Sequence, residues 1–255
     1  MQTDKIVFSN SWEFFPCYVN NQPFSIRFDR AVESLESSVK ENYPHTLVLT
    51  IHASESDEHG LPTPSALERI NNIDDKFSAG AYDIRLIGVI TGGGCSRFVF
   101  CCDNKAQAEF ENVLETLLGD SINDTAFECK VFDNDNFAYY DKAVAPNSYE
   151  WQWIMNRHIC TNLEKDGEAF KRPRNIDFFC IFDSDQHIDE TVKKLKQQGF
   201  KETDRNKAEN GEYNISLTLT GIPKFEWING ITADILDTLS NTDGRFDGWG
   251  TAVFR

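Results

Sequence analysis

A run of eight residues, from Tyr213 to Thr220, constrains the fold of this chain more than any other segment. Apolar residues alternate in it with Asn, Ser and Thr at every position. Successive side chains of a β-strand point to opposite faces of the sheet, so one face of this strand is apolar and the other polar. The run therefore predicts an antiparallel sheet that is covered on one side and open to solvent on the other.

The segments around this strand predict a complete α+β unit. Asn210-Gly211 is a strong hairpin signal and pairs the run with a strand at residues 200–204. Apolar residues at helical spacing predict helices within 185–199 and 223–239, and strands are predicted at 176–182 and around Trp249. Residues 176–254 therefore follow the order β-α-β-β-α-β, which is typical of a ferredoxin-like sandwich.

The first half of the chain predicts the same order of elements. Thr63 and Asp103 are N-cap residues of predicted helices that end near Gly80 and Gly119. Strands are predicted at 46–51, 82–90, 97–102 and 126–132, after a hairpin over 12–28. We therefore predict an α+β protein of two tandem ferredoxin-like sandwiches with antiparallel sheets, the first with an extra N-terminal hairpin.

A polar stretch from Asp133 to Asn147 separates the two halves. It is rich in Asp and Asn and carries Pro146 near its end, a composition typical of linkers. The predicted domains are therefore residues 1–140 and 148–255. A helix is predicted after the linker, and four residues at helical spacing define its apolar face: Trp151, Met155, Ile159 and Leu163.

The charge of the chain restricts the partners that it can bind. The formal net charge is −16, of which −12 falls on residues 1–146 and −4 on residues 147–255. An acidic surface without a basic stripe repels phosphate backbones, so we expect no direct binding of nucleic acid. A basic protein partner fits this charge, and so does the simpler interpretation that the acidity only keeps the protein in solution.

Neither a membrane-spanning segment nor a disulfide framework is predicted. No stretch approaches the roughly 18 apolar residues of a membrane span, and the N-terminus lacks the features of a signal peptide. The seven cysteines are odd in number and dispersed, which predicts reduced thiols. We therefore expect a cytoplasmic protein; the sequence leaves its oligomeric state open.

No motif predicts catalysis, a cofactor or a metal. The loop that holds His52, Glu55, Asp57 and His59 matches no pattern of metal ligands, so we interpret it as a solvated acidic loop. The three glycines at 92–94 lack the Lys-Ser/Thr pair of a phosphate-binding loop, and they predict a turn. We therefore expect no catalytic, cofactor-binding or metal-binding residues, and we do not expect the protein to be an enzyme.

Two glycines flank a tryptophan in the last predicted strand. Gly248 and Gly250 permit a β-bulge or the close approach of another backbone, and Trp249 offers a large apolar surface with one N–H donor. Two interpretations are open: Trp249 packs under a helix, or it faces a binding partner.

From about Asn162 onward, several short stretches resemble the regulator of ribonuclease activity B family in order and spacing. The stretches are Leu163-Glu164-Lys165-Asp166-Gly167, Pro173-Arg174-Asn175-Ile176-Asp177-Phe178-Phe179, Gln198-Gly199-Phe200 and Phe246-Asp247-Gly248-Trp249-Gly250-Thr251. The resemblance implies a ferredoxin-like fold without chemistry of its own, and inhibition of the endoribonuclease ribonuclease E through protein contact. The first half is similar to a domain of unknown function, numbered 695, which implies no activity.

We therefore expect a non-catalytic regulator that binds a protein, with a ribonuclease E-like or toxin-like basic protein as the partner. The residues expected at the contact are Arg174, Asp177, Phe246, Asp247 and Trp249. Arg174 and Asp177 can instead pair with one another. Two alternative functions remain: an immunity or antitoxin-like protein that neutralises a basic toxin, and a small-ligand or enzymatic role in a cleft between the domains.

Overall fold

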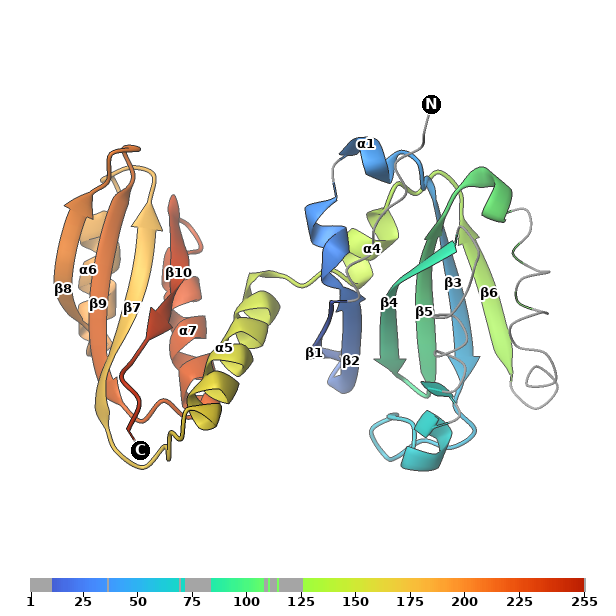
Figure 1. Ribbon diagram of the computed structural model, residues 1–255, viewed down its shortest axis with the longest axis horizontal. Helices are drawn as coiled ribbons and strands as arrows, with labels where there is room; N and C mark the ends of the chain where they lie inside the picture. The colour runs from blue at the N-terminus through green and yellow to red at the C-terminus, as the bar shows by residue number, and fades with distance from the viewer. Residues whose placement is uncertain are drawn as a thin grey trace. The chain divides into compact units, whose positions relative to one another are not determined.

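Two units make up the part of the chain that the structure describes (Figure 1). The computed structural model describes residues 11–35, 37–68, 70–71, 84–107, 110, 114 and 126–254. Contacts between Cα atoms divide the chain between Pro146 and Asn147. Each unit combines an antiparallel sheet with helices, so the protein belongs to the α+β class.

The C-terminal unit is a four-stranded sheet with the strand order β10-β7-β9-β8. Its elements follow one another as strand, helix, strand, strand, helix and strand, in the order that the sequence predicts, and α6 and α7 lie behind the sheet in Figure 1. The bounds are Arg174–Phe182 for β7, Ile188–Gln197 for α6, Lys201–Lys207 for β8, Tyr213–Gly221 for β9, Phe225–Leu239 for α7 and Gly244–Gly250 for β10.

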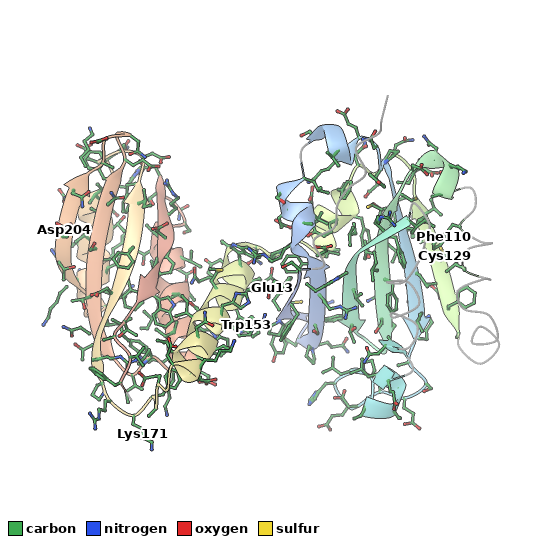
Figure 2. The ribbon with its side chains drawn as sticks, viewed as in Figure 1. Glu13, Phe110, Cys129, Trp153, Lys171 and Asp204 are labelled. Atoms are coloured by element: carbon green, nitrogen blue, oxygen red, sulfur yellow. The ribbon has the colours of Figure 1, made fainter. Side chains whose placement is uncertain are left out.

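The alternating run of β9 has the two faces that its pattern predicts. Ile215 and Leu217 are buried in the core between the sheet and the helices, together with Phe178 of β7. Ser216 and Thr220 point to the opposite, outer face of the sheet. Strand β8 forms one edge of this sheet and is rich in charged residues, among them the exposed Asp204 (Figure 2), a composition that discourages pairing with other chains.

Strand β10 contains the bulge that its glycines permit. The register with β7 shifts between Phe246 and Gly248, which leaves Asp247 as the extra residue of the bulged strand. Gly248 has a φ of 127°, a value that residues with a Cβ rarely adopt. Of the two arrangements that the glycines permit, the β-bulge is present.

Helix α5, Ser148–Lys165, precedes β7 and packs on α7. Asn147 begins it with a capping box, because its side chain accepts from the N–H of Glu150 while the Glu150 carboxylate accepts from the N–H of Asn147. The predicted apolar face was wrong at Met155, which is 38% exposed. The buried positions include Ile154, the polar Asn156 and Leu163, so the inward stripe is displaced from the one that apolar spacing alone suggests.

The N-terminal unit is a six-stranded sheet with the strand order β1-β2-β4-β5-β3-β6. The predicted hairpin, β1 and β2, forms and lies beside β4, where it extends the sheet. The bounds are Trp12–Val19 for β1, Gln22–Asp29 for β2, His45–His52 for β3, Ile84–Gly92 for β4, Cys95–Cys102 for β5 and Phe127–Phe132 for β6. The short helices η1, Arg30–Ser34, and α1, Ser37–Lys40, lie between β2 and β3.

Both helices predicted in this unit fall only partly within the described residues. The residues 64–68, 70–71, 104–107, 110 and 114 are helical, and the rest of each predicted helix lies outside the described part. Asp103 caps the second helix, because its side chain accepts the N–H of Ala106 at 2.7 Å. Phe110 (Figure 2) and Ile70 are buried in one core cluster with Phe100 of β5.

The predicted linker was wrong in its central part, where helix α4 spans Ala138–Ala143. Tyr140 is buried and donates its hydroxyl to Glu33 at 2.8 Å, and Val144 is buried against Gly88 of β4. Burial raises the pKa of Tyr140, and the neighbouring Glu33 carboxylate raises it further. The apolar side of this helix comes from so few residues that the surrounding polar ones conceal it in the sequence.

Gly88 allows α4 to lie directly on β4, because a Cβ at this position would collide with the Val144 side chain. We expect Gly88→Ala to lower the free energy of unfolding by about 1–3 kcal/mol, as overpacked cores do. The double variant Gly88→Ala/Val144→Ala should lose less than the sum of the two single losses in urea denaturation. Additive losses would show that the two residues do not press on one another.

Candidate functional site

Trp249 packs inside the C-terminal unit, which decides between the two interpretations of this residue. It is 6% exposed and belongs to the core cluster between sheet and helices. Its indole Nε1 donates a hydrogen bond to Oδ1 of Asn156 at 2.8 Å. The expectation that Trp249 anchors a partner does not fit this position, because an anchoring side chain must be accessible in the free protein.

Asn156 holds three elements of this unit together through its side-chain amide. Oδ1 accepts from Trp249 of β10 and from Gln152 of α5, each at 2.8 Å. Nδ2 donates to Asn229 Oδ1 and to Thr232 Oγ1, both on α7 and both at 2.8 Å. All the donors and acceptors of this amide are therefore satisfied, which is what a fully buried asparagine requires.

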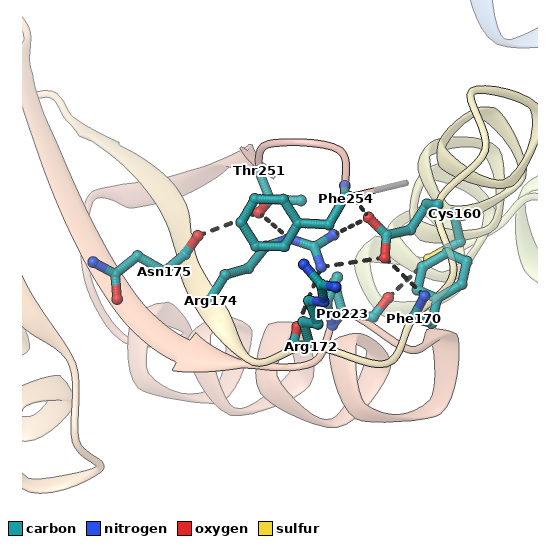
Figure 3. Close-up of polar contacts among 9 residues, drawn as sticks. Cys160, Phe170, Arg172, Arg174, Asn175, Pro223, Thr251 and Phe254 are labelled. Atoms are coloured by element: carbon teal, nitrogen blue, oxygen red, sulfur yellow. Dashed lines mark hydrogen bonds and ion pairs between the residues drawn. The ribbon is translucent and has the colours of Figure 1, made fainter.

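Arg174 (Figure 3) also makes its contacts within the unit, where it forms an ion pair with Glu168. Nη2 lies 2.8 Å from Glu168 Oε2, Nη1 donates to Oε1 at 3.3 Å, and Nε donates to Thr251 Oγ1 at 2.9 Å. Both side chains of the ion pair are almost completely buried. The alternative in which Arg174 pairs with Asp177 was wrong, because residues three apart on a strand point to opposite faces.

The Glu168 carboxylate is the acceptor that fixes the end of the chain. It accepts the backbone N–H of Phe170 at 2.7 Å and of Phe254 at 2.8 Å, and the Phe254 ring lies 5.0 Å from the Arg174 guanidinium (Figure 3). Desolvation by burial raises the pKa of Glu168, but the two N–H donors and the guanidinium outweigh it, so that the pKa is lowered overall.

The other expected contact residues differ in exposure: the two acids are exposed, and the aromatic residue is partly buried. Phe246 packs partly buried against the core, with its ring 6.5 Å from that of Phe178. Asp177 is exposed on the outer face of β7, and Asp247 is exposed at the bulge of β10. Of the five residues, Asp177 and Asp247 are the two that are exposed, Phe246 is partly exposed, and the role of these residues in binding stays a prediction.

Sequence reasoning missed Phe179, which lies on the same outer face as Asp177. Its side chain is 40% exposed, and its neighbours in the sheet are Ser216 of β9 and Gly248 of β10. A signal for it was present: Phe178 and Phe179 are adjacent on one strand, so one ring points into the core and the other points away. Asn156 and Glu168 were missed as well, and no local pattern distinguishes them from surface residues.

A second polar cluster joins the end of β7 to the start of β10. Asp243 accepts the Ser184 hydroxyl at 2.6 Å and contacts His187 Nδ1 at 2.9 Å; these hydrogen bonds lower the pKa of Asp243 to about 2. Since the serine hydroxyl donates to the carboxylate and not to the imidazole, these three side chains do not have the arrangement of a Ser-His-Asp triad. His187 also borders a groove of about 510 Å³ that α6 and α7 line with both acidic and basic side chains.

The thiols of the C-terminal unit and of β5 are poor nucleophiles. Burial raises the pKa of Cys160 to about 11 and that of Cys102 and Cys180 to about 12. Within the described ranges, no three His, Cys, Asp or Glu side chains are grouped so that they would hold a metal ion. No helix in the same ranges is both long and apolar enough to cross a membrane.

The Asn156 amide can be tested by removing its polar atoms while keeping its approximate volume. We expect Asn156→Leu to lower the free energy of unfolding by about 2–4 kcal/mol, because it leaves buried donors such as Trp249 Nε1 unpaired. Urea denaturation followed by far-UV circular dichroism measures the loss. Met155→Leu, at the exposed neighbouring position, is the matched control and should stay within about 0.5 kcal/mol of the wild type.

The buried ion pair gives a pH-dependent prediction. At pH 7, Glu168→Gln should lower the free energy of unfolding by about 3–5 kcal/mol, because it leaves the Arg174 charge buried without a counter-ion. A lowered folded-state pKa means that Glu168 contributes its stability above about pH 4.3, the unfolded value, and loses it as the pH falls further. The difference in the free energy of unfolding between the wild type and Glu168→Gln should therefore become smaller below pH 4. A difference that stays constant with pH would contradict this account.

Comparisons with known proteins bear on both halves of the chain. Residues 153–251 match the family Regulator of ribonuclease activity B, and residues 10–142 match DUF695, a family of unknown function. Comparison with curated proteins gives no match. A solved structure, "Crystal structure of putative glycine cleavage system transcriptional repressor", has 9% identity and a TM-score of 0.24 over 82% of this chain and 98% of its own. The chain thus belongs to the family DUF695 through its N-terminal half, and its C-terminal half matches Regulator of ribonuclease activity B.

Proposed function

We propose that this protein is a non-catalytic regulator whose C-terminal unit binds a ribonuclease E-type endoribonuclease and lowers its activity. The match of residues 153–251 to Regulator of ribonuclease activity B supports a role in the regulation of a ribonuclease. The observation that carries the proposal is the outer face of the sheet β10-β7-β9-β8, which α6 and α7 leave open (Figure 1). An open sheet face with an exposed aromatic residue is suited to contact with another protein.

The inward-facing polar groups of this unit support a binding role, because their hydrogen bonds are made to other parts of the unit. The side-chain amide of Asn156 joins α5, α7 and β10. The Arg174 guanidinium forms an ion pair with Glu168 and a hydrogen bond with Thr251. Catalysis needs polar groups that are held ready for a substrate and not consumed by internal bonds. In this unit, the side chains that remain available lie on the surface.

The net charge supports a basic partner. The chain carries −16 overall and −4 in residues 147–255, so a positively charged protein is attracted over a distance of about one Debye length. Such attraction acts mainly on the rate of association and weakens with salt. We also propose that the protein acts in the cytoplasm, where the seven cysteine thiols would stay reduced.

The strand order of both sheets supports the finer assignment of the fold. In the C-terminal unit the order is β10-β7-β9-β8, and in the N-terminal unit β6-β3-β5-β4 repeats it with the hairpin β2-β1 added beside β4. Both units are therefore consistent with the split βαβ topology of ferredoxin-like sandwiches.

Purified ribonuclease E tests the proposed function directly. We expect the full-length protein to slow the cleavage of a single-stranded RNA substrate in a saturable manner, and to do so less at high salt. A small basic ribonuclease of the pancreatic type is the control and should cleave at an unchanged rate. Equal inhibition of both enzymes would favour the neutralisation of basic nucleases in general, and no inhibition by a large excess of folded protein would refute the proposal.

A further inference from the structure

Two glycines without side chains lie along the edge strand β10, on the outer face of the C-terminal sheet. Gly248 of β10 lies opposite Phe179 of β7, and Gly250 lies opposite Asp177. Phe179 and Asp177 are two residues apart on one strand, so their side chains leave the same face roughly 7 Å apart. We call the surface formed by Asp177, Phe179, Gly248 and Gly250, with Asp247 at its edge, the Phe179 face.

The fold accounts for one of these glycines and not for the other. Gly248 is required by its φ of 127° in the bulge. Gly250 has no left-handed backbone conformation, and a Cβ added to it would meet no atom within 4 Å. Gly250 is the last residue of β10, and a glycine that neither backbone conformation nor packing requires leaves room for the close approach of another chain.

The exposed groups beside these glycines are complementary to a cation with a flat surface. Phe179 presents its ring at 40% exposure, and Ser216 on its other side is too small to cover it. In the described part of the chain neither Asp177 nor Asp247 has an ion-pair partner, whereas the nearby Arg245 is bound by Asp183 and Glu212. An exposed aromatic ring therefore lies on the same face as the Asp177 carboxylate, and Asp247 is exposed at the adjacent bulge.

We propose that the Phe179 face binds an arginine side chain from a basic segment of a protein partner, an inference that rests on the proposed protein-binding function. The guanidinium lies on the Phe179 ring and pairs with Asp177 and Asp247, and the backbone of the partner passes over Gly248 and Gly250. Arginine fits better than lysine, because its planar guanidinium stacks on aromatic rings and binds carboxylates through two parallel hydrogen bonds. A nucleic acid fits less well, because these carboxylates repel phosphate.

Peptide titrations on the full-length protein test this site without the natural partner. The probes are a fluorescent glycine-serine peptide with several arginines, the same peptide with lysines, and an RNA oligonucleotide of similar length. We expect the arginine peptide to bind about tenfold tighter than the lysine peptide, and the RNA not to bind. Equal affinity for the two peptides, or tighter binding of the RNA, would overturn the proposal.

Substitutions on the Phe179 face separate binding from folding. Phe179→Thr and Asp177→Asn should each remove the preference for arginine. Gly250→Val should weaken the binding of the arginine peptide at least tenfold. Its melting temperature should stay at or above that of the wild type, because valine favours strands and the site has room for it in the free protein. Gly230→Ala is the matched control on α7, where a Cβ is equally unobstructed, and should leave peptide binding unchanged.

Two combinations of results distinguish this inference from the proposed function. If the wild type and Gly250→Val inhibit ribonuclease E equally and bind the arginine peptide equally, the Phe179 face is not the site, although the proposed function stands. If ribonuclease E is not inhibited and the arginine preference disappears in Phe179→Thr, the site stands and the identity of the partner is wrong.

Discussion

The arrangement of the C-terminal unit depends on one side-chain amide, that of Asn156. Its hydrogen bonds join α5, α7 and the last strand, β10, so that the most N-terminal and the most C-terminal element of the unit meet at one residue. Hydrophobic packing has no direction and tolerates small displacements. An amide with four satisfied bonds does not, because any shift of α5 leaves a buried donor or acceptor unpaired.

This constraint also explains how the outer face of the sheet is kept free. Trp249 turns inward to reach Asn156, so that its neighbours Gly248 and Gly250 face outward on β10. The ion pair between Arg174 and Glu168 also helps to position β10, because it holds the residues after β10 beside the start of β7. The polar groups inside the unit thus fix the edge strand, and the edge strand determines which groups a partner meets.

Sequence patterns predicted those elements whose structure is determined by residues close to one another in the sequence. The alternation of β9, the cap at Asp103 and the bulge at Gly248 follow from side-chain direction, hydrogen-bonding capacity and backbone freedom, which are properties of a few neighbouring residues. Asn156 could not be placed in this way, because the residue that justifies its burial, Trp249, follows 93 positions later. The same holds for α4, whose Tyr140 is buried against the distant Glu33.

The burial of the thiols makes one cysteine chemically distinct from the others. Cys129 is exposed on β6 (Figure 2), Cys17 is half-buried, and the remaining five are buried. Because an alkylating reagent needs access to a thiolate, a maleimide dye should modify Cys129 first. The native chain therefore carries its own attachment point for a fluorescent reporter, and none of the residues that form the Phe179 face is a cysteine that the dye could modify.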